Sequence, residues 1–226
     1  MYRKVELVVL ALLLIGLMAA SKNLQRYVSG ENVKKGKTIV ALDAGHGGDD
    51  PGKIGVNNAE EKEINLEIAE QVKALLEEEE IEVLMTREDD TMLAKEADTN
   101  KKVQDMKARV QKINEAAPAL VVSIHQNSYS EESIHGAQVF YYTHSEAGKK
   151  AAEIMQKELL SVDPENTRQA KANDTYYLLK RTEVPTIIVE CGFLSNYEEA
   201  EKLIDPEYQK QLSQAIVKGI ITCLEN

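Results

Sequence analysis

The 226-residue chain has the composition of a folded, acidic protein. Hydrophobic residues make up 43% of it, charged residues 29%, and the formal net charge is −11. Once an N-terminal segment is set aside, this length suits one domain with a buried core. Because an acidic chain gains nothing from counterion release on DNA or RNA, the charge excludes a general nucleic-acid-binding role.

The N-terminus has the features of an export signal. Arg3 and Lys4 precede an apolar stretch at residues 7–20. A stretch of about 14 residues is short for a membrane span of roughly 20 and ordinary for a signal-peptide core. We therefore expect residues 1–21 to be a signal peptide or a retained signal anchor. The polar residues 22–37 predict a linker, and the protein is expected outside the cytoplasm, anchored to the membrane or secreted.

The remainder, residues 38–226, alternates short apolar runs with amphipathic segments. Strands are predicted at 38–42, 82–85, 120–124, 137–142 and 186–190, with a short edge strand within 173–180. Helices are predicted from residue 61 onward and at 103–116, 147–160 and 207–224. Several strands are continuous apolar runs, which favour a sheet covered on both faces. The prediction is a single α/β domain with a mixed, largely parallel sheet and helices on both faces.

Polar side chains stand where three of these strands end. The first strand runs into Asp43 and His46, the third into His125 and Asn127, and the last ends on Glu190. If these strands are parallel, the two histidines and Glu190 share one rim of the sheet. Two imidazoles and one carboxylate form a usual catalytic zinc set, and a further carboxylate is able to act as a base. The spacing matches no short zinc motif, so this pattern alone leaves metal binding open.

The glycine-rich loop after the first strand has an alternative interpretation as a phosphate-binding loop. Residues 47–53 satisfy G-x-x-x-x-G-K. However, Ile54 stands where a Ser or Thr should hold Mg²⁺, and Asp49 and Asp50 would place negative charge in the cradle. No helix is predicted to begin there and offer its positive end to a phosphate. These residues therefore argue against nucleotide binding.

The other histidines and the two cysteines are predicted to take no part in chemistry. His135 and His144 lie in polar surroundings, which predicts surface positions. Cys191 and Cys223 are too few for a disulfide framework. Their places near a strand end and a helix end predict buried free thiols.

Four motifs, taken in order, resemble a known family. They are DAGHGGDDPGKIG, EKEINLEIA, VVSIHQN and TIIVECGFLSN. In order and approximate spacing they are similar to the zinc-dependent N-acetylmuramoyl-L-alanine amidases of the amidase-3 group. The resemblance extends from Thr38 to the C-terminus.

The resemblance implies roles for four residues. His46, Glu61 and His125 occupy the positions of the family's zinc ligands, and Glu190 that of its catalytic glutamate. From its position alone, Glu61 is equally a helix-start carboxylate favoured by the helix dipole. The EK context selects it over the neighbouring glutamates.

Residues around these positions carry further expectations. Asp43 is expected either to orient a ligand or to serve only in the turn, and Asn127 to lie next to the ligands. The chain departs from the family pattern at Ala44, Gln126 and Cys191. None of these is a ligand, but the last two flank a ligand or the base and are expected to tune the shape of the pocket.

The function implied is hydrolysis of the amide between N-acetylmuramic acid and the L-alanine of the peptidoglycan stem peptide, with Zn²⁺ as cofactor. Residues 165–168, Lys171 and the insert after Arg87 are similar to germination-specific members of the group. That similarity implies roles in spore cortex maturation, muramic lactam formation and germination.

The partners implied are peptidoglycan and an activating lipoprotein or other membrane-associated protein. The membrane itself is a further partner if the N-terminal segment stays uncleaved. A partner that binds the ordered ligand loops would raise zinc occupancy. Two alternatives stay open: a non-catalytic wall-binding protein with the same fold, and a zinc peptidase that acts on the stem peptide.

Overall fold

Six strands and six helices alternate along residues 38–226, the part of the chain that the computed structural model describes. The strands are β1 (Ile39–Ala44), β2 (Glu82–Met85), β3 (Leu120–Asn127), β4 (Gln138–Tyr142), β5 (Lys171–Asn173) and β6 (Thr186–Phe193). The helices are α2 (Glu61–Glu78), α3 (Lys101–Ala116), α4 (Glu146–Leu160), α5 (Tyr177–Arg181), α6 (Tyr197–Leu203) and α7 (Pro206–Glu225). This alternation confirms the predicted α/β class.

The strands form one mixed sheet in the order β2-β1-β3-β6-β4-β5. β1 is parallel to β2 and β3, and β3 is parallel to β6, whereas β4 runs antiparallel to β6. The three strands that were predicted to carry the polar residues are therefore parallel neighbours. Their carboxyl ends lie at one rim, where His125 is the direct partner of Glu190.

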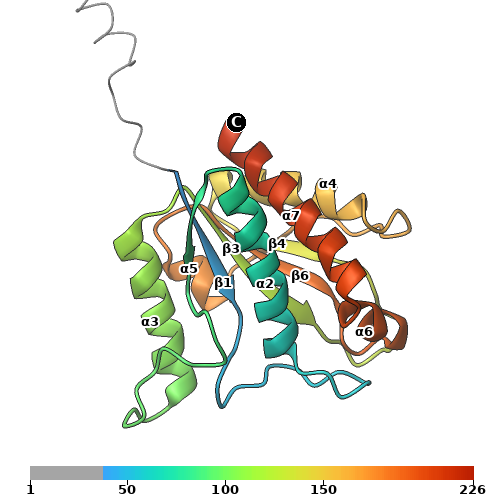
Figure 1. Ribbon diagram of the computed structural model, residues 1–226, viewed down its shortest axis with the longest axis horizontal. Helices are drawn as coiled ribbons and strands as arrows, with labels where there is room; N and C mark the ends of the chain where they lie inside the picture. Colours follow the sequence, from blue (N-terminus) through green and yellow to red (C-terminus); the bar gives the residue numbers. More distant parts are fainter. Residues whose placement is uncertain (1–37) are drawn as a thin grey trace, which may run out of the picture. The chain divides into compact units, whose positions relative to one another are not determined.

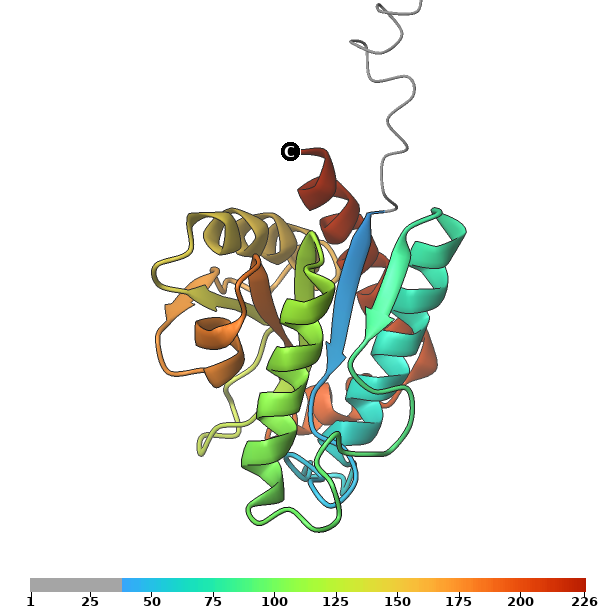
Figure 2. The same cartoon turned by 90° about the vertical axis from the view of Figure 1, so that its left-hand side faces the viewer.

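Side-chain alternation along the strands builds a core on each face of the sheet. On β3, Val122 and Ile124 belong to the larger core, which packs under α2, α4 and α7. Val121 belongs to a smaller core with residues of α3 and α5. Figures 1 and 2 show these helices on opposite sides of the sheet. The same alternation places His125 and Glu190 on the α3 and α5 side.

Two local predictions need correction. The strand near residues 173–180 is β5, which ends at Asn173, and residues 177–181 form helix α5. The Asn173 side chain accepts the backbone N–H groups of Thr175 (2.8 Å) and Tyr176 (2.9 Å), which ends the strand and turns the chain into the helix. Helix α6 was not predicted, because its 7 residues are too few to show a clear period.

Other predictions from the sequence fall at the surface or outside the described residues. His135 and His144 are exposed, as predicted. Both cysteines are free; Cys191 is buried and Cys223 half-buried. The expected export segment and linker lie in residues 1–37, which the structure does not describe. Within residues 38–226, every helix is too short or too polar to cross a membrane.

Candidate metal centre

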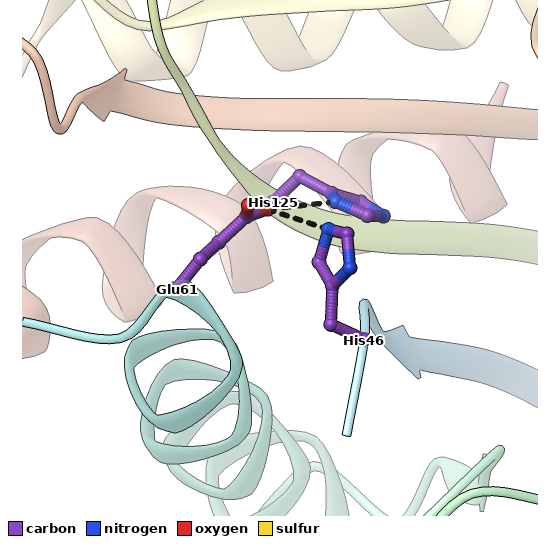
Figure 3. Close-up of side chains that lie close together, drawn as sticks. All are labelled: His46, Glu61 and His125. Carbon is purple, nitrogen blue, oxygen red and sulfur yellow. Dashed lines mark hydrogen bonds and ion pairs between the residues drawn. The ribbon is translucent and has the colours of Figure 1, made fainter. Parts of the chain in front are cut away.

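Three of the predicted ligands meet at the rim of the sheet. His46 comes from the loop after β1, Glu61 opens α2, and His125 lies in β3 (Figure 3). Their ligand atoms all lie within 4.8 Å of one another. One Glu61 carboxylate oxygen is 3.2 Å from His46 Nε2 and 2.9 Å from His125 Nδ1. Two imidazole nitrogens and a carboxylate thus converge from three separate elements, as a catalytic zinc set requires.

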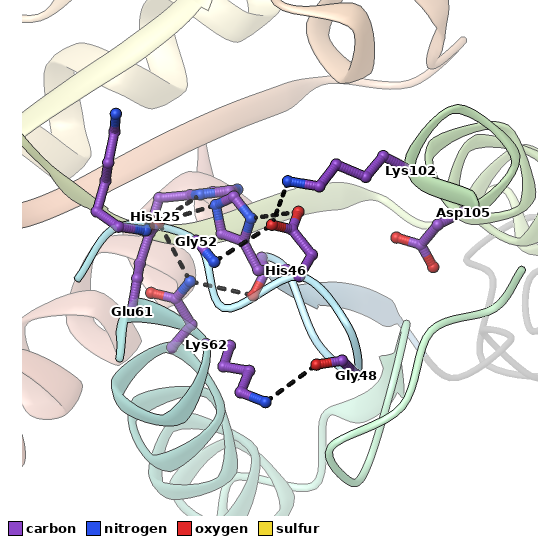
Figure 4. Close-up of polar contacts among 12 residues, drawn as sticks. His46, Gly48, Gly52, Glu61, Lys62, Lys102, Asp105 and His125 are labelled. Atoms are coloured by element: carbon purple, nitrogen blue, oxygen red, sulfur yellow. Dashed lines mark hydrogen bonds and ion pairs between the residues drawn. The ribbon is translucent and has the colours of Figure 1, made fainter. Parts of the chain in front are cut away.

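His46 is held in place by a carboxylate that sequence reasoning missed. Its backbone is in the left-handed region, at φ 62°, which is uncommon for a non-glycine residue. Asp50 Oδ2 lies 2.9 Å from His46 Nδ1, which turns Nε2 toward Glu61. The other Asp50 oxygen pairs with Lys102 at 2.7 Å (Figure 4). The sequence signal for Asp50 was its place four residues after a candidate ligand, because a carboxylate bonded to a ligand imidazole fixes the imidazole tautomer.

Two buried arginines hold the backbone of the His46 loop. Arg109 donates to the carbonyl oxygen of Ala44 at 2.8 Å and to that of His46 at 2.5 Å. Arg87 donates to Ala44 O at 2.9 Å and to Gly45 O at 3.1 Å. Because carbonyl groups buried without donors are costly, these bonds stabilise the turn that presents His46.

Asp43 acts on this loop through Arg109. Its carboxylate accepts hydrogen bonds from Arg109 (2.7 Å), Ser123 (2.6 Å) and Thr86 (2.7 Å). The Asn127 side chain instead accepts the backbone N–H of the next residue, at 2.8 Å. Among the hydrogen bonds of the described residues, neither side chain contacts a ligand imidazole. Asp43 therefore supports the loop that carries a ligand and does not orient an imidazole directly.

Asp43 makes the apoprotein sensitive to acid. Burial opposes its ionisation, but Arg109 and the two hydroxyl donors lower its pKa from 3.8 to about 2. A carboxyl group with that depressed folded pKa contributes about 2 kcal/mol above pH 4, and the contribution disappears as the pH falls through 2. We expect Asp43→Asn to lower the free energy of unfolding at pH 7 by about 3 kcal/mol, because Arg109 loses a buried partner.

Urea unfolding of the parent and the Asn variant at pH 7, 4 and 3, with chelator throughout, measures this effect. The difference in free energy of unfolding between the two proteins should narrow as the pH falls, because only the parent loses the stabilising contribution of the ionised Asp43 carboxylate. A gap that stays constant over this range would show that the Asp43 carboxylate does not titrate in this way.

The charges of the ligands favour a cation at this point. Burial raises the pKa of Glu61, yet the hydrogen bonds and charges of the two histidines hold it well below its ordinary range. Burial lowers the pKa of His125, but the hydrogen bond and charge of Glu61 outweigh it and raise the value to about 9. The metal-free centre therefore binds a proton tightly at neutral pH. A metal ion would displace that proton.

Glycines allow the backbone to approach the ligands closely. A Cβ atom on Gly45 would lie 2.2 Å from the His125 ring, and one on Gly52 would lie 2.6 Å from a Glu61 carboxylate oxygen. Gly52 also has a φ of +72°, which a side chain would strain. Gly52 belongs to the loop at residues 47–53 that was considered for phosphate binding, so this loop packs against two of the ligands, Glu61 and His46.

Gln126 and Cys191, two of the departures from the family pattern, lie behind the ligands. Both are buried. The backbone N–H of Gln126 donates to a Glu61 oxygen at 3.1 Å, and its side-chain amide donates to Asn65 at 3.2 Å. Asn65 in turn donates to the Gly45 carbonyl at 3.1 Å. The Gln126 side chain therefore ties β3 to α2 below the ligand Glu61.

Glu190 is a buried carboxylate next to the three ligands. It is 6% exposed, and its Oε2 atom is fully buried without a hydrogen-bond partner among the described residues. Burial and the charge of Glu61 raise its pKa to about 7, against the lowering effect of the two histidines and Tyr176. A carboxylate with a free oxygen and a pKa near neutrality is suited to accept a proton during a reaction.

The fold and the site together define a class of protein. The domain is α/β. At the carboxyl ends of its parallel strands it carries two histidines, one carboxylate that is a candidate ligand, and a second carboxylate that is a candidate base. This set is that of a metal-dependent hydrolase, in which two imidazoles and a carboxylate hold the ion and leave a position open.

Comparisons with known proteins identify the family. The model of the Amidase_3 family, N-acetylmuramoyl-L-alanine amidase, matches residues 40–222. The germination-specific N-acetylmuramoyl-L-alanine amidase of Bacillus subtilis is 39% identical over 186 residues, which cover 81% of this chain and 78% of that protein. The chain therefore belongs to the Amidase_3 family and is a peptidoglycan N-acetylmuramoyl-L-alanine amidase, as the four sequence motifs predicted.

Solved structures agree with this assignment. The CwlD amidase of Clostridioides difficile, in complex with the GerS lipoprotein, matches with a TM-score of 0.81 and 38% identity, over 84% of this chain and 99% of that chain. The catalytic domain of CwlV, an N-acetylmuramoyl-L-alanine amidase from Bacillus (Paenibacillus) polymyxa var. colistinus, matches with a TM-score of 0.74 and 30% identity, over 83% and 98%.

Proposed function

We propose that this amidase is zinc-dependent and acts on spore cortex peptidoglycan, during cortex maturation with formation of muramic lactam and during germination. The observation that carries the chemistry is the convergence of three ligand side chains beside a buried carboxylate with a free oxygen. The similarity to a germination-specific amidase supports the biological setting.

His46, Glu61 and His125 are the residues that would hold the ion. Their donor set fits zinc, which takes imidazole nitrogen and carboxylate oxygen in catalytic sites. The glycine contacts at the ligands and the hydrogen bond that His46 donates to Asp50 fit a site whose ligands are oriented before the ion arrives. When bound, zinc supplies a positive charge that acidifies water and polarises the amide carbonyl.

Glu190 is the proposed general base. It pairs with His125 across the β3–β6 ladder, so the backbone holds its carboxylate beside the ligands. Its free oxygen would take a proton from the attacking water and then give it to the departing amine of L-alanine. Exclusion of water from this buried carboxylate raises its basicity, and the charge of a nearby cation would keep it ionised at neutral pH.

The protein is proposed to act outside the cytoplasm, with residues 1–21 as its signal peptide or anchor. A CwlD amidase has been solved in complex with a lipoprotein, which supports an activating lipoprotein as a partner here as well. Such a partner would raise zinc occupancy if it bound the ordered ligand loops preferentially. Fractionation of a tagged protein tests the location, and recovery only in the cytoplasm would reject it.

Digestion of purified peptidoglycan, with and without a chelator, tests the proposed chemistry. Mass spectrometry of the released fragments should find intact stem peptides that begin with a free L-alanine amine, and the chelator should abolish their release. Added zinc should restore it. Fragments cut within the stem peptide would instead show a zinc peptidase, and chelator-resistant release of intact stems would reject the metal dependence.

A further inference from the structure

Arg168 lies on the same face of the sheet as the proposed base. Its Nη1 donates to the side-chain oxygen of Gln138 at 3.2 Å. Gln138 is the direct partner of Glu190 across the antiparallel β4–β6 ladder. Directly paired residues project to the same face of a sheet, so a row runs across it from His125 through Glu190 and Gln138 to Arg168.

The Arg168 guanidinium is fixed in place by further contacts. Its Nε donates to the carbonyl oxygen of His135 at 2.6 Å. Its central carbon lies 4.6 Å from the centre of the Phe193 ring, in a cation–π contact. A guanidinium held in one orientation loses little freedom when it binds a ligand, which is what a recognition residue needs.

Within residues 38–226, this cation has unused donors and forms no ion pair with an acidic side chain. Two of the five guanidinium N–H groups have acceptors, and Nη2 donates to nothing among the described residues. Glu199 is the acid that acts on it electrostatically, but the two do not form an ion pair, and the Glu199 carboxylate accepts the backbone N–H groups of Gly136 and Phe193. Lys171, the partner of Phe140 on the edge strand, adds a second positive charge to this face.

We propose that Arg168 binds a carboxylate of the stem peptide, on the second or third residue from the amide that is cut. The proposal rests on the amidase activity and specifies how its substrate is recognised. The guanidinium contacts Gln138, one strand away from Glu190, and stacks on Phe193, three residues further along β6. At about 3.3 Å per residue and about 4.8 Å between strands, these contacts place it roughly 10 Å from Glu190. An extended peptide covers about 3.3–3.6 Å per residue, which brings its second or third residue to this distance.

The chemistry of both partners favours this ligand. The planar fork of a guanidinium matches a carboxylate, with which it forms charge-assisted hydrogen bonds. The chain as a whole is acidic, at −11, so a peptide that carries carboxylates is repelled except where a local cation receives it. Arg168 therefore determines which stem peptides bind, whereas the ligands and Glu190 carry out the reaction.

Matched muramyl peptides test the proposal on the full chain loaded with zinc. One carries free carboxylates, and two others carry a carboxamide at the second or the third residue. The parent should show a KM about tenfold or more higher for one of the two amidated substrates, with little change in kcat, because a charge-assisted bond is lost. Arg168→Gln should bind the peptide with free carboxylates and that amidated peptide equally. Its KM for both should match the KM of the parent for the amidated peptide.

Two variants separate recognition from a structural role. Arg168→Lys keeps the charge and should keep part of the preference for the acid. Arg181→Gln is the matched control, because Arg181 also stacks on an aromatic ring, that of Tyr177 at 5.8 Å, but lies at the end of α5. It should behave like the parent.

Three results overturn the proposal. The first is cleavage of all three peptides by the parent with equal KM, which needs no variant and so does not depend on how Arg168→Gln folds. The second is retention of the parent's preference for the acid by Arg168→Gln with full zinc content. Failure of the parent to release a stem peptide from any of the three would instead reject the amidase assignment for these substrates and, with it, this inference.

Discussion

Glu190→Gln should lower turnover by roughly a hundred- to ten-thousand-fold, the range expected for loss of a general base. The amide has nearly the shape of the carboxylate but lacks the basic oxygen. Because Glu190 Oε2 accepts no hydrogen bond in the described structure, its replacement breaks no contact of that atom. The variant should therefore fold, hold zinc at the parent's level and still bind peptidoglycan fragments.

Single-turnover kinetics and elemental analysis of the same preparations measure this prediction. Glu183→Gln is the matched control, since it makes the same chemical change on an exposed residue before the start of β6. This control variant should leave the turnover rate and the zinc content unchanged. Activity within a few-fold of the parent would reject Glu190 as the base. Loss of zinc together with activity would make Glu190 a ligand and reopen the choice of base.

The central strands were predictable because each is buried on both faces. The apolar runs at residues 40–42 of β1, 120–122 of β3 and 187–189 of β6 are buried, so each run itself marks its strand. Residues at the edge follow other rules. The first two residues of β5 are exposed, so no apolar pattern predicts this strand. The strand ends where the Asn173 side chain accepts a backbone N–H group.

The two histidine ligands and the proposed base were predictable in type, whereas Glu61 was selected by the family resemblance and the supporting residues were not predicted. His46, His125 and Glu190 each stand at or near the end of an apolar strand, so the parallel sheet alone brings them to one rim. The contacts of Arg109 and Asp50 with the His46 loop depend on how α3 and the glycine loop fold back over the sheet. Such contacts join residues far apart in the chain, or within an irregular loop, and leave no period in the sequence.

Replacing any one of His46, Glu61 or His125 by Ala should remove the metal and the activity together. An open site has only three protein ligands, so loss of one leaves two and cannot be compensated from within the set. Loss of a partner that only orients a ligand costs about 10–100-fold in metal affinity. We therefore expect each ligand variant to lose more than that, and Asp50→Asn, which leaves all three ligands in place, to fall within that range.

Zinc content after gel filtration, together with a competition titration against a chelator, ranks the variants. The order expected is parent, then Asp50→Asn, then the three ligand variants. His135→Ala and His144→Ala are the matched controls, because both imidazoles are exposed outside the triad. They should match the parent. Zinc affinity of the parent should also rise with pH, since Glu61 raises the pKa of His125 to about 9 and the ion must displace that proton. Full zinc content in all three ligand variants would show that the ion binds elsewhere, whereas an affinity independent of pH would show that His125 binds it without losing a proton.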